Sequence, residues 1–118
     1  MYLQFNQIKQ IENLESLELL DTINLSNNYI TKLENLSCCP LLSSLIITHN
    51  CIEYTSDLEH LIECKNLTSL DLSYNKITDE LALDVFGKMK LLVSIFCYEK
   101  LRSRSDCFKI VCFYSDLL

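Results

Sequence analysis

One asparagine recurs along most of the chain, and the apolar residues around it keep the same spacing each time. The asparagines are Asn6, Asn28, Asn50 and Asn75, so the intervals are 22, 22 and 25 residues. Apolar residues precede each asparagine by three and by five positions, and an isoleucine follows each by two. A unit this short cannot bury its apolar side alone, so the pattern predicts units that stack into a solenoid.

The spacing inside each unit predicts its local structure. The two apolar residues before an asparagine, such as Ile23 and Leu25, alternate as they do in a short strand. After the asparagine, apolar residues recur about every three positions, which favours 3₁₀ or short α-turns. The position eight residues after each asparagine is apolar throughout, at Leu14, Leu36, Leu58 and Leu83.

These patterns together predict an α/β fold, a curved leucine-rich repeat solenoid. We expect a parallel β-sheet on its concave face and short 3₁₀ or α-turns on its convex face. The segment after Asn75 is predicted to be more helical than the others, with Leu81, Val85 and Met89 spaced at four residues.

The repeated asparagine has a structural interpretation. Its amide carries donors and an acceptor on a short arm, so it can bond the turn that follows each strand from within the core. We therefore expect a structural asparagine ladder formed by Asn6, Asn28, Asn50 and Asn75.

The repeat pattern fails toward the end of the chain. A fifth unit begins near Leu92, but its ladder position is Lys100, which cannot replace a buried amide. We assign about four and a half repeats of 22–25 residues to residues 1–100 and a non-repeat tail to residues 101–118. Because the chain enters in the middle of a repeat, we expect it to be a fragment or truncated form of a longer protein.

Charge, hydropathy and cysteine content limit the classes of function that this chain can have. The net charge is −6 and the isoelectric point about 4.8, which argues against broad binding to nucleic acid. No apolar run is long enough to span a membrane. Seven cysteines without a CxxC pair favour reduced thiols packed as small apolar groups.

Neither catalysis nor a metal site is expected. An open curve offers no pocket for paired catalytic groups, and no catalytic motif is present. His49 and His60 do not stand at metal-ligand spacing with nearby cysteines. We expect His49 on the concave rim and His60 on the convex surface, with no cofactor and no small-molecule substrate.

Several runs carry a family resemblance. "IKQIENLESL" and "ITKLENLSCC" resemble the SDS22-like class of leucine-rich repeats. Within that class, "NLSNNYITKLENLSCCPLL" and "LTSLDLSYNKITD" look similar to the repeats of the dynein axonemal assembly factor 1 family of ciliary proteins. The resemblance covers residues 2–96.

This resemblance implies a non-enzymatic scaffold that helps axonemal dynein arms assemble in the cytoplasm, with the cilium as a further location. Its implied partners are proteins, such as dynein arm subunits or their chaperones. Three alternatives stay open. The chain could regulate a protein phosphatase, as SDS22-like proteins do, act as an RNA-associated adaptor, or be a truncated product without a function of its own.

The strand pattern also predicts which residues would meet a partner. Residues between the inward-pointing apolar positions must point outward, onto the concave face. Aromatic and apolar side chains among them are candidate anchors, because such groups dominate many interfaces. The predicted partner-binding residues are Tyr2, Phe5, Asn24, Ile46, His49, Asp71, Tyr74 and Phe96.

Overall fold

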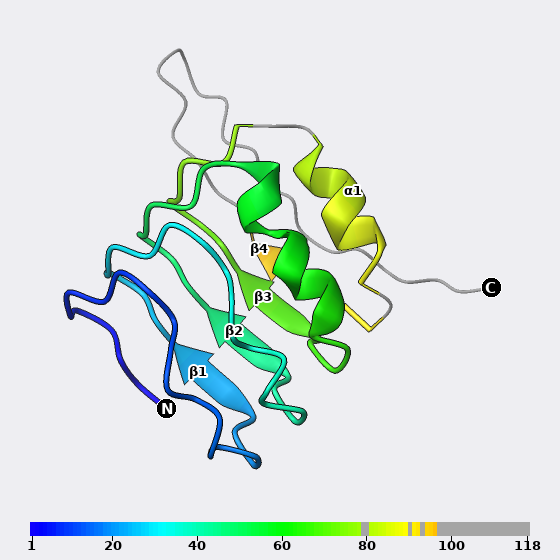
Figure 1. Cartoon of the computed structure of the whole chain (residues 1–118). Coiled ribbons are helices and arrows are strands. Elements are labelled where there is room, and N and C mark those ends of the chain that lie inside the picture. Colours follow the sequence, from blue (N-terminus) through cyan, green and yellow to red (C-terminus); the bar gives the residue numbers. More distant parts are fainter. Residues whose placement is uncertain (79–80, 90, 93, 97–118) are drawn as a thin grey trace.

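The computed structural model describes residues 1–78, 81–89, 91–92 and 94–96, and of residues 94 and 96 it describes the backbone. Four short strands form one parallel sheet in chain order (Figure 1). They are β1 (Thr22–Asn24), β2 (Ser44–Ile46), β3 (Ser69–Asp71) and β4 (Ser94–Phe96). The predicted solenoid is therefore confirmed. The tail predicted for residues 101–118 lies outside the described residues.

The strand register follows the repeat. Ile23, Leu45, Leu70 and Ile95 stand opposite one another in the ladder, and all four are fully buried. Tyr2 pairs with Asn24 through an isolated parallel bridge, which extends the row of paired backbones to the first repeat. All four strands therefore send their central side chain into the core, and β1, β2 and β3 direct their two flanking residues toward the concave face.

The convex side is built from tight turns that explain the three-residue apolar spacing. In the second repeat, the Cys39 N–H donates to the Leu36 carbonyl at 3.1 Å, and the Leu42 N–H donates to the Cys39 carbonyl at 3.1 Å. Such i to i+3 bonds eclipse every third side chain. The side chains of Leu36, Cys39 and Leu42 consequently all reach the core, as predicted from their spacing.

Repeat length decides where helices form. The first two intervals, of 22 residues, contain turns on the convex side. The interval from Asn50 to Asn75 is three residues longer and holds two 3₁₀ helices, η1 (Thr55–Asp57) and η2 (Glu59–Glu63). The next repeat carries the α-helix α1 (Ala82–Gly87). Figure 1 shows these helical segments in front of the sheet, on the convex side.

The side of α1 that faces the core differs from our expectation. Leu81 and Leu83 are 61% and 41% exposed, so neither belongs to the core. Val85 and Met89 are buried as predicted, and Ala82 and Phe86 are buried in place of Leu81 and Leu83. The reason is geometric, because an α-helix advances 100° per residue and its buried stripe follows i, i+3 and i+4, whereas the other repeats keep a spacing of three.

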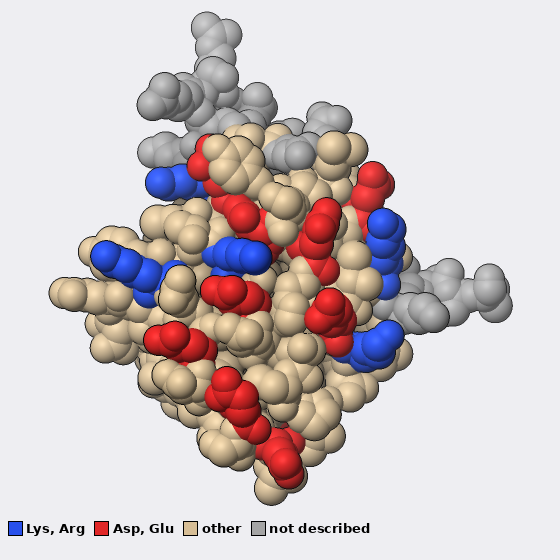
Figure 2. Space-filling view, viewed as in Figure 1, with Lys and Arg blue, Asp and Glu red and all other residues tan. Residues whose placement is uncertain are grey.

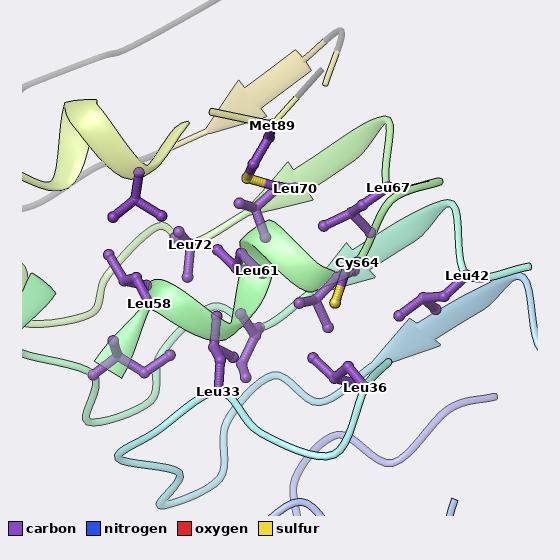
Figure 3. Close-up of a cluster of buried hydrophobic side chains, with 14 of the residues drawn as sticks. Leu33, Leu36, Leu42, Leu58, Leu61, Cys64, Leu67, Leu70, Leu72 and Met89 are labelled. Carbon is purple, nitrogen blue, oxygen red and sulfur yellow. The ribbon is translucent and has the colours of Figure 1, made fainter. Parts of the chain in front are cut away.

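The core is a single layer between the sheet and the convex turns. Figure 3 shows Leu61 and Cys64 of the third repeat packed beside Leu70 and Leu72 of the fourth repeat, with Met89 next to Leu70. One contiguous cluster of buried apolar residues runs from Ile11 to Ile95. Each fully buried leucine stabilises the fold by about 1.5–3 kcal/mol relative to exposure.

Candidate functional site

The concave face rests on the asparagine ladder at the ends of the strands. Asn50 donates from its amide to the carbonyls of Leu25 at 2.9 Å and Thr48 at 3.0 Å. Its carbonyl oxygen accepts from the Ile30 N–H at 3.0 Å. Asn28 and Asn75 make the corresponding bonds one repeat earlier and one repeat later. All three side chains are buried, so each ties its own turn to the preceding repeat.

Asn6 stands in the same repeat position but in a different environment. It is exposed, and its amide donates to the carbonyls of Leu3 and Gln4 in its own repeat, at 2.9 and 3.2 Å. The sequence pattern alone treats Asn6 and Asn50 as equivalent. Burial distinguishes them, because of the four ladder asparagines only Asn28, Asn50 and Asn75 are buried and bond across two repeats.

The residue before each ladder asparagine has a left-handed backbone. The φ angles are 58° at Phe5, 58° at Asn27, 52° at His49 and 59° at Tyr74. In each of the four repeats, this conformation directs the side chain to the same edge of the sheet. We call these four residues the rim: Phe5, Asn27, His49 and Tyr74. Within the rim, the rings of His49 and Tyr74 stack with centroids 4.4 Å apart and planes 15° apart.

A second set of predicted residues crosses the sheet from strand to strand. The register places Tyr2, Asn24, Ile46, Asp71 and Phe96 side by side, and we call them the concave row. Tyr2 is 77% exposed, and Asn24, Ile46 and Asp71 are half-buried. Because neighbouring strands lie about 4.8 Å apart, the row from Tyr2 to Asp71 spans about 14 Å.

Two members of the row hold their own turn. The Asn24 side-chain oxygen accepts from the Ser26 N–H at 3.0 Å, and Asp71 Oδ1 accepts from the Ser73 N–H at 3.0 Å. Asparagine and aspartate are therefore interchangeable in local geometry at this repeat position, and they differ in charge.

The alternation rule misplaced two residues of one column, whose other described members, Gln4 and Thr48, are half-buried. Ser26 and Ser73, two positions before their ladder asparagines, should point outward, but both are buried. The chain turns sharply at this point, and the Ser26 hydroxyl accepts from the Thr48 N–H of the next repeat at 3.3 Å. The presence of serine, a small residue able to bond backbone groups, is the signal that could have indicated this.

His60 also differs from our expectation. It is not a surface residue, since its side chain is 17% exposed. Its Nε2 accepts from the N–H groups of Leu36 at 3.0 Å and Ser37 at 3.3 Å, in the preceding repeat. An accepting Nε2 places the ring proton on Nδ1, which lies 3.4 Å from Oε2 of Glu63. His60 is therefore a structural tie between two convex segments.

The convex surface around these ties is mixed in charge. Side chains of both signs are present, but Figure 2 shows acidic ones predominating and, toward the lower end of the view, acidic ones alone. A surface of this kind suits solvation.

The predicted position of His49 at the concave rim agrees with its exposed side chain and its stacking on Tyr74.

The buried cysteines pack as apolar groups. Burial raises the pKa of the Cys39 thiol and of the Cys64 thiol to about 11, so both carry their proton at neutral pH. All four cysteines in the described part of the chain have free thiols. Within the same residues no three metal-ligating side chains cluster, and no helix is long and apolar enough to cross a membrane.

The family of the chain follows from comparison with known proteins. The model of the leucine-rich repeat family matches residues 1–110. This chain belongs to the leucine-rich repeat family. Members of this family are stacked repeats with an open concave surface, as the sheet and the asparagine ladder show here.

Two relatives of this leucine-rich repeat chain are similar to it over different lengths. A dynein axonemal assembly factor 1 homologue of Drosophila pseudoobscura pseudoobscura is 46% identical over 53 residues, which cover 45% of this chain and 3% of that protein. The U2 small nuclear ribonucleoprotein A' of Mycosarcoma maydis is 31% identical over 102 residues, covering 84% of this chain and 42% of that protein.

A solved structure agrees with the fold. Internalin C2 of Listeria monocytogenes superimposes with a TM-score of 0.69 at 27% identity, over 81% of this chain and 40% of that one. The chain thus spans less than half the length of each of these three proteins. The comparisons support a protein-interaction scaffold with partial similarity to dynein axonemal assembly factors.

Proposed function

We propose that this chain is a protein-interaction scaffold whose concave face binds a protein partner during the cytoplasmic preassembly of axonemal dynein arms. The observation that carries the proposal is the placement of exposed or half-buried apolar and aromatic groups on one concave face, with Tyr2 and Ile46 in the concave row and Tyr74 on the rim. Rigid aromatic anchors lose little conformational entropy on binding, so they contribute strongly to interfaces.

The similarity to dynein axonemal assembly factors supports this assignment over other scaffold roles. The proposed partners are dynein arm subunits or their chaperones. The face is a shallow curve of strand residues, which suits the surface of a protein. The proposed role needs neither a cofactor nor catalysis.

The test is recovery of the partner from an extract of ciliated cells by the tagged chain. The double variant Ile46→Asn and Tyr74→Asn removes two anchors and introduces residues that the second repeat already has in the same positions, Asn24 and Asn27. Recovery of dynein arm subunits should fall at least about tenfold, a loss expected when interface anchors are removed.

The matched control is Leu83→Asn, which removes an exposed apolar side chain from α1 on the convex side. This variant should recover the same proteins as the parent. Equal recovery by the parent and the double variant, with both folded, would contradict a concave binding site. The acidic convex side around Glu12, Glu15 and Glu18 would then become the candidate surface.

A second candidate function has one specific observation in its favour. The similarity to the U2 small nuclear ribonucleoprotein A' extends over 84% of this chain. The same extract discriminates between the two, because an adaptor of that type should recover ribonucleoprotein components and leave dynein subunits behind.

A further inference from the structure

Charge is distributed unevenly on the concave face. The described side chains of the concave row and the rim include one carboxylate, that of Asp71, and no lysine or arginine. The inner column beside them consists of Gln4, Ser26, Thr48 and Ser73, which are uncharged. Among the described residues of these three columns, Asp71 therefore carries the single negative charge and its neighbours are uncharged or apolar.

The Asp71 carboxylate has spare bonding capacity. Its Oδ1 accepts from the Ser73 N–H at 3.0 Å, and no cationic side chain among the described residues pairs with it. A carboxylate offers about four acceptor positions. Since the side chain is half-buried beside Ile46, a partner that covers it must supply donors, or the charge would be buried unpaired.

An aromatic surface lies close to this carboxylate along the chain. Asp71 ends β3, and Tyr74 follows three residues later on the rim, with its ring stacked against His49 and 47% of the residue exposed. A guanidinium group combines both complementary properties, because it pairs with carboxylates through a planar fork and stacks on aromatic faces. An ammonium group pairs with a carboxylate only as a point charge, because it lacks the planar fork.

We propose that the concave face takes a basic segment of the partner protein, in which an arginine lies against Asp71 and the Tyr74 ring and a flanking apolar side chain packs on Ile46. The inference rests on the proposed function for the use of this face and adds the chemistry of the occupant. The net charge of −6 favours the approach of such a segment. The same charges disfavour phosphate-rich partners, because Asp71 would lie against an anion.

The test uses a random twelve-residue peptide phage library selected on the purified chain. Selection on the parent should enrich arginine next to a leucine or isoleucine. Selection on Asp71→Asn should lose that arginine enrichment, since asparagine keeps the local bond that Asn24 makes and removes the charge. The matched control Asp84→Asn removes one charge from the exposed part of α1 and should enrich arginine as the parent does.

A selected peptide, synthesised and titrated by calorimetry, should bind Asp71→Asn on the order of tenfold more weakly than the parent, as expected for loss of one charge-assisted bond. The inference is overturned if the parent enriches acidic or uncharged peptides, enriches nothing, or enriches arginine equally after Asp71→Asn.

The two proposals fail in distinguishable ways. Suppose that the Asp71→Asn variant still recovers the dynein subunits that the double variant Ile46→Asn and Tyr74→Asn fails to recover. The scaffold proposal then stands and the arginine inference fails. If the library yields arginine peptides that need Asp71 while extracts yield no dynein subunit, the arginine inference stands and the proposed cellular role fails.

Discussion

Neighbouring repeats are tied together differently on the two sides of the solenoid. At the strand ends, Asn28, Asn50 and Asn75 repeat one bonding pattern at three successive junctions. On the convex side the ties come from different repeat positions. The Asn35 amide donates to the Ile11 carbonyl at 2.7 Å, the His60 ring accepts from Leu36 and Ser37, and the Asn66 amide donates to the Pro40 carbonyl at 2.6 Å.

This difference follows from the regular spacing of parallel strands and the irregular structure of the convex segments. Strands in register place equivalent backbone groups at equivalent points. Asparagine at one repeat position can therefore bond these groups at each of the three junctions. Convex segments differ in length and contain turns, 3₁₀ helices or an α-helix, so their unpaired backbone groups fall at different places. Side chains at different repeat positions therefore satisfy them, as Asn35, His60 and Asn66 do.

The largest expected effect is on the regular side. Asn50→Ala should lower the free energy of unfolding by about 2–3 kcal/mol, because buried carbonyls and the Ile30 N–H lose their partner. Chemical denaturation would measure it. Asn6→Ala is the matched control and should lose less than about 1 kcal/mol, since Asn6 is exposed. Equal losses at both positions would contradict a role for burial in the ladder.

The next effect probes the irregular side. His60→Ala should destabilise by about 1–2 kcal/mol, because the N–H groups of Leu36 and Ser37 lose a shared acceptor. Glu63→Gln should change stability by less than about 0.5 kcal/mol, since Glu63 is 67% exposed. Thermal unfolding of both variants would show whether the ring or its ion-pair contact matters. A larger loss for Glu63→Gln would reverse our assignment of the tie.

A smaller effect separates a bond from a backbone requirement. Asn35 has a φ of 57° and also donates to Ile11, so either property could explain its presence. Asn35→Gly keeps the left-handed backbone accessible and removes the bond. We expect a loss of about 0.5–1.5 kcal/mol in denaturant titrations. No loss, or a gain, would mean that the backbone conformation alone selects this residue.

The smallest effect has the opposite sign. Phe5 adopts a φ of 58° and is 78% exposed, so its ring contributes little packing to offset backbone strain. Phe5→Asn should stabilise the fold by about 0.5–1 kcal/mol, because asparagine tolerates this conformation better. A rise in melting temperature would check this. A fall would indicate that Phe5 packs more favourably than its exposure implies.

The regular side was the predictable one. The strands and the core positions Ile23, Leu45 and Leu70 follow from the repeat, because their spacing is imposed by register. The burial of Ser26 and the role of His60 could not be predicted, since both depend on which backbone groups a neighbouring repeat leaves unpaired. The exposure of Leu83 depends on α1 adopting a different periodicity from the earlier turns.

The candidate site was predictable to a similar degree. Register places Asn24, Ile46 and Asp71 in one row, as the alternation of strand residues requires. The stacking of His49 on Tyr74 depends on the left-handed backbone of both residues, which the sequence marks only by their place before an asparagine.

The repeat length has a further consequence for how such a chain folds. In the described part, the side-chain bonds that join neighbouring repeats connect residues from 20 to 28 positions apart. Loop-closure entropy depends on the length of the closed loop, so docking each additional repeat closes a loop of nearly constant size. Assembly can then proceed as a zipper from any stable pair of repeats. The entropy of closing each step would not grow with the number of repeats already docked.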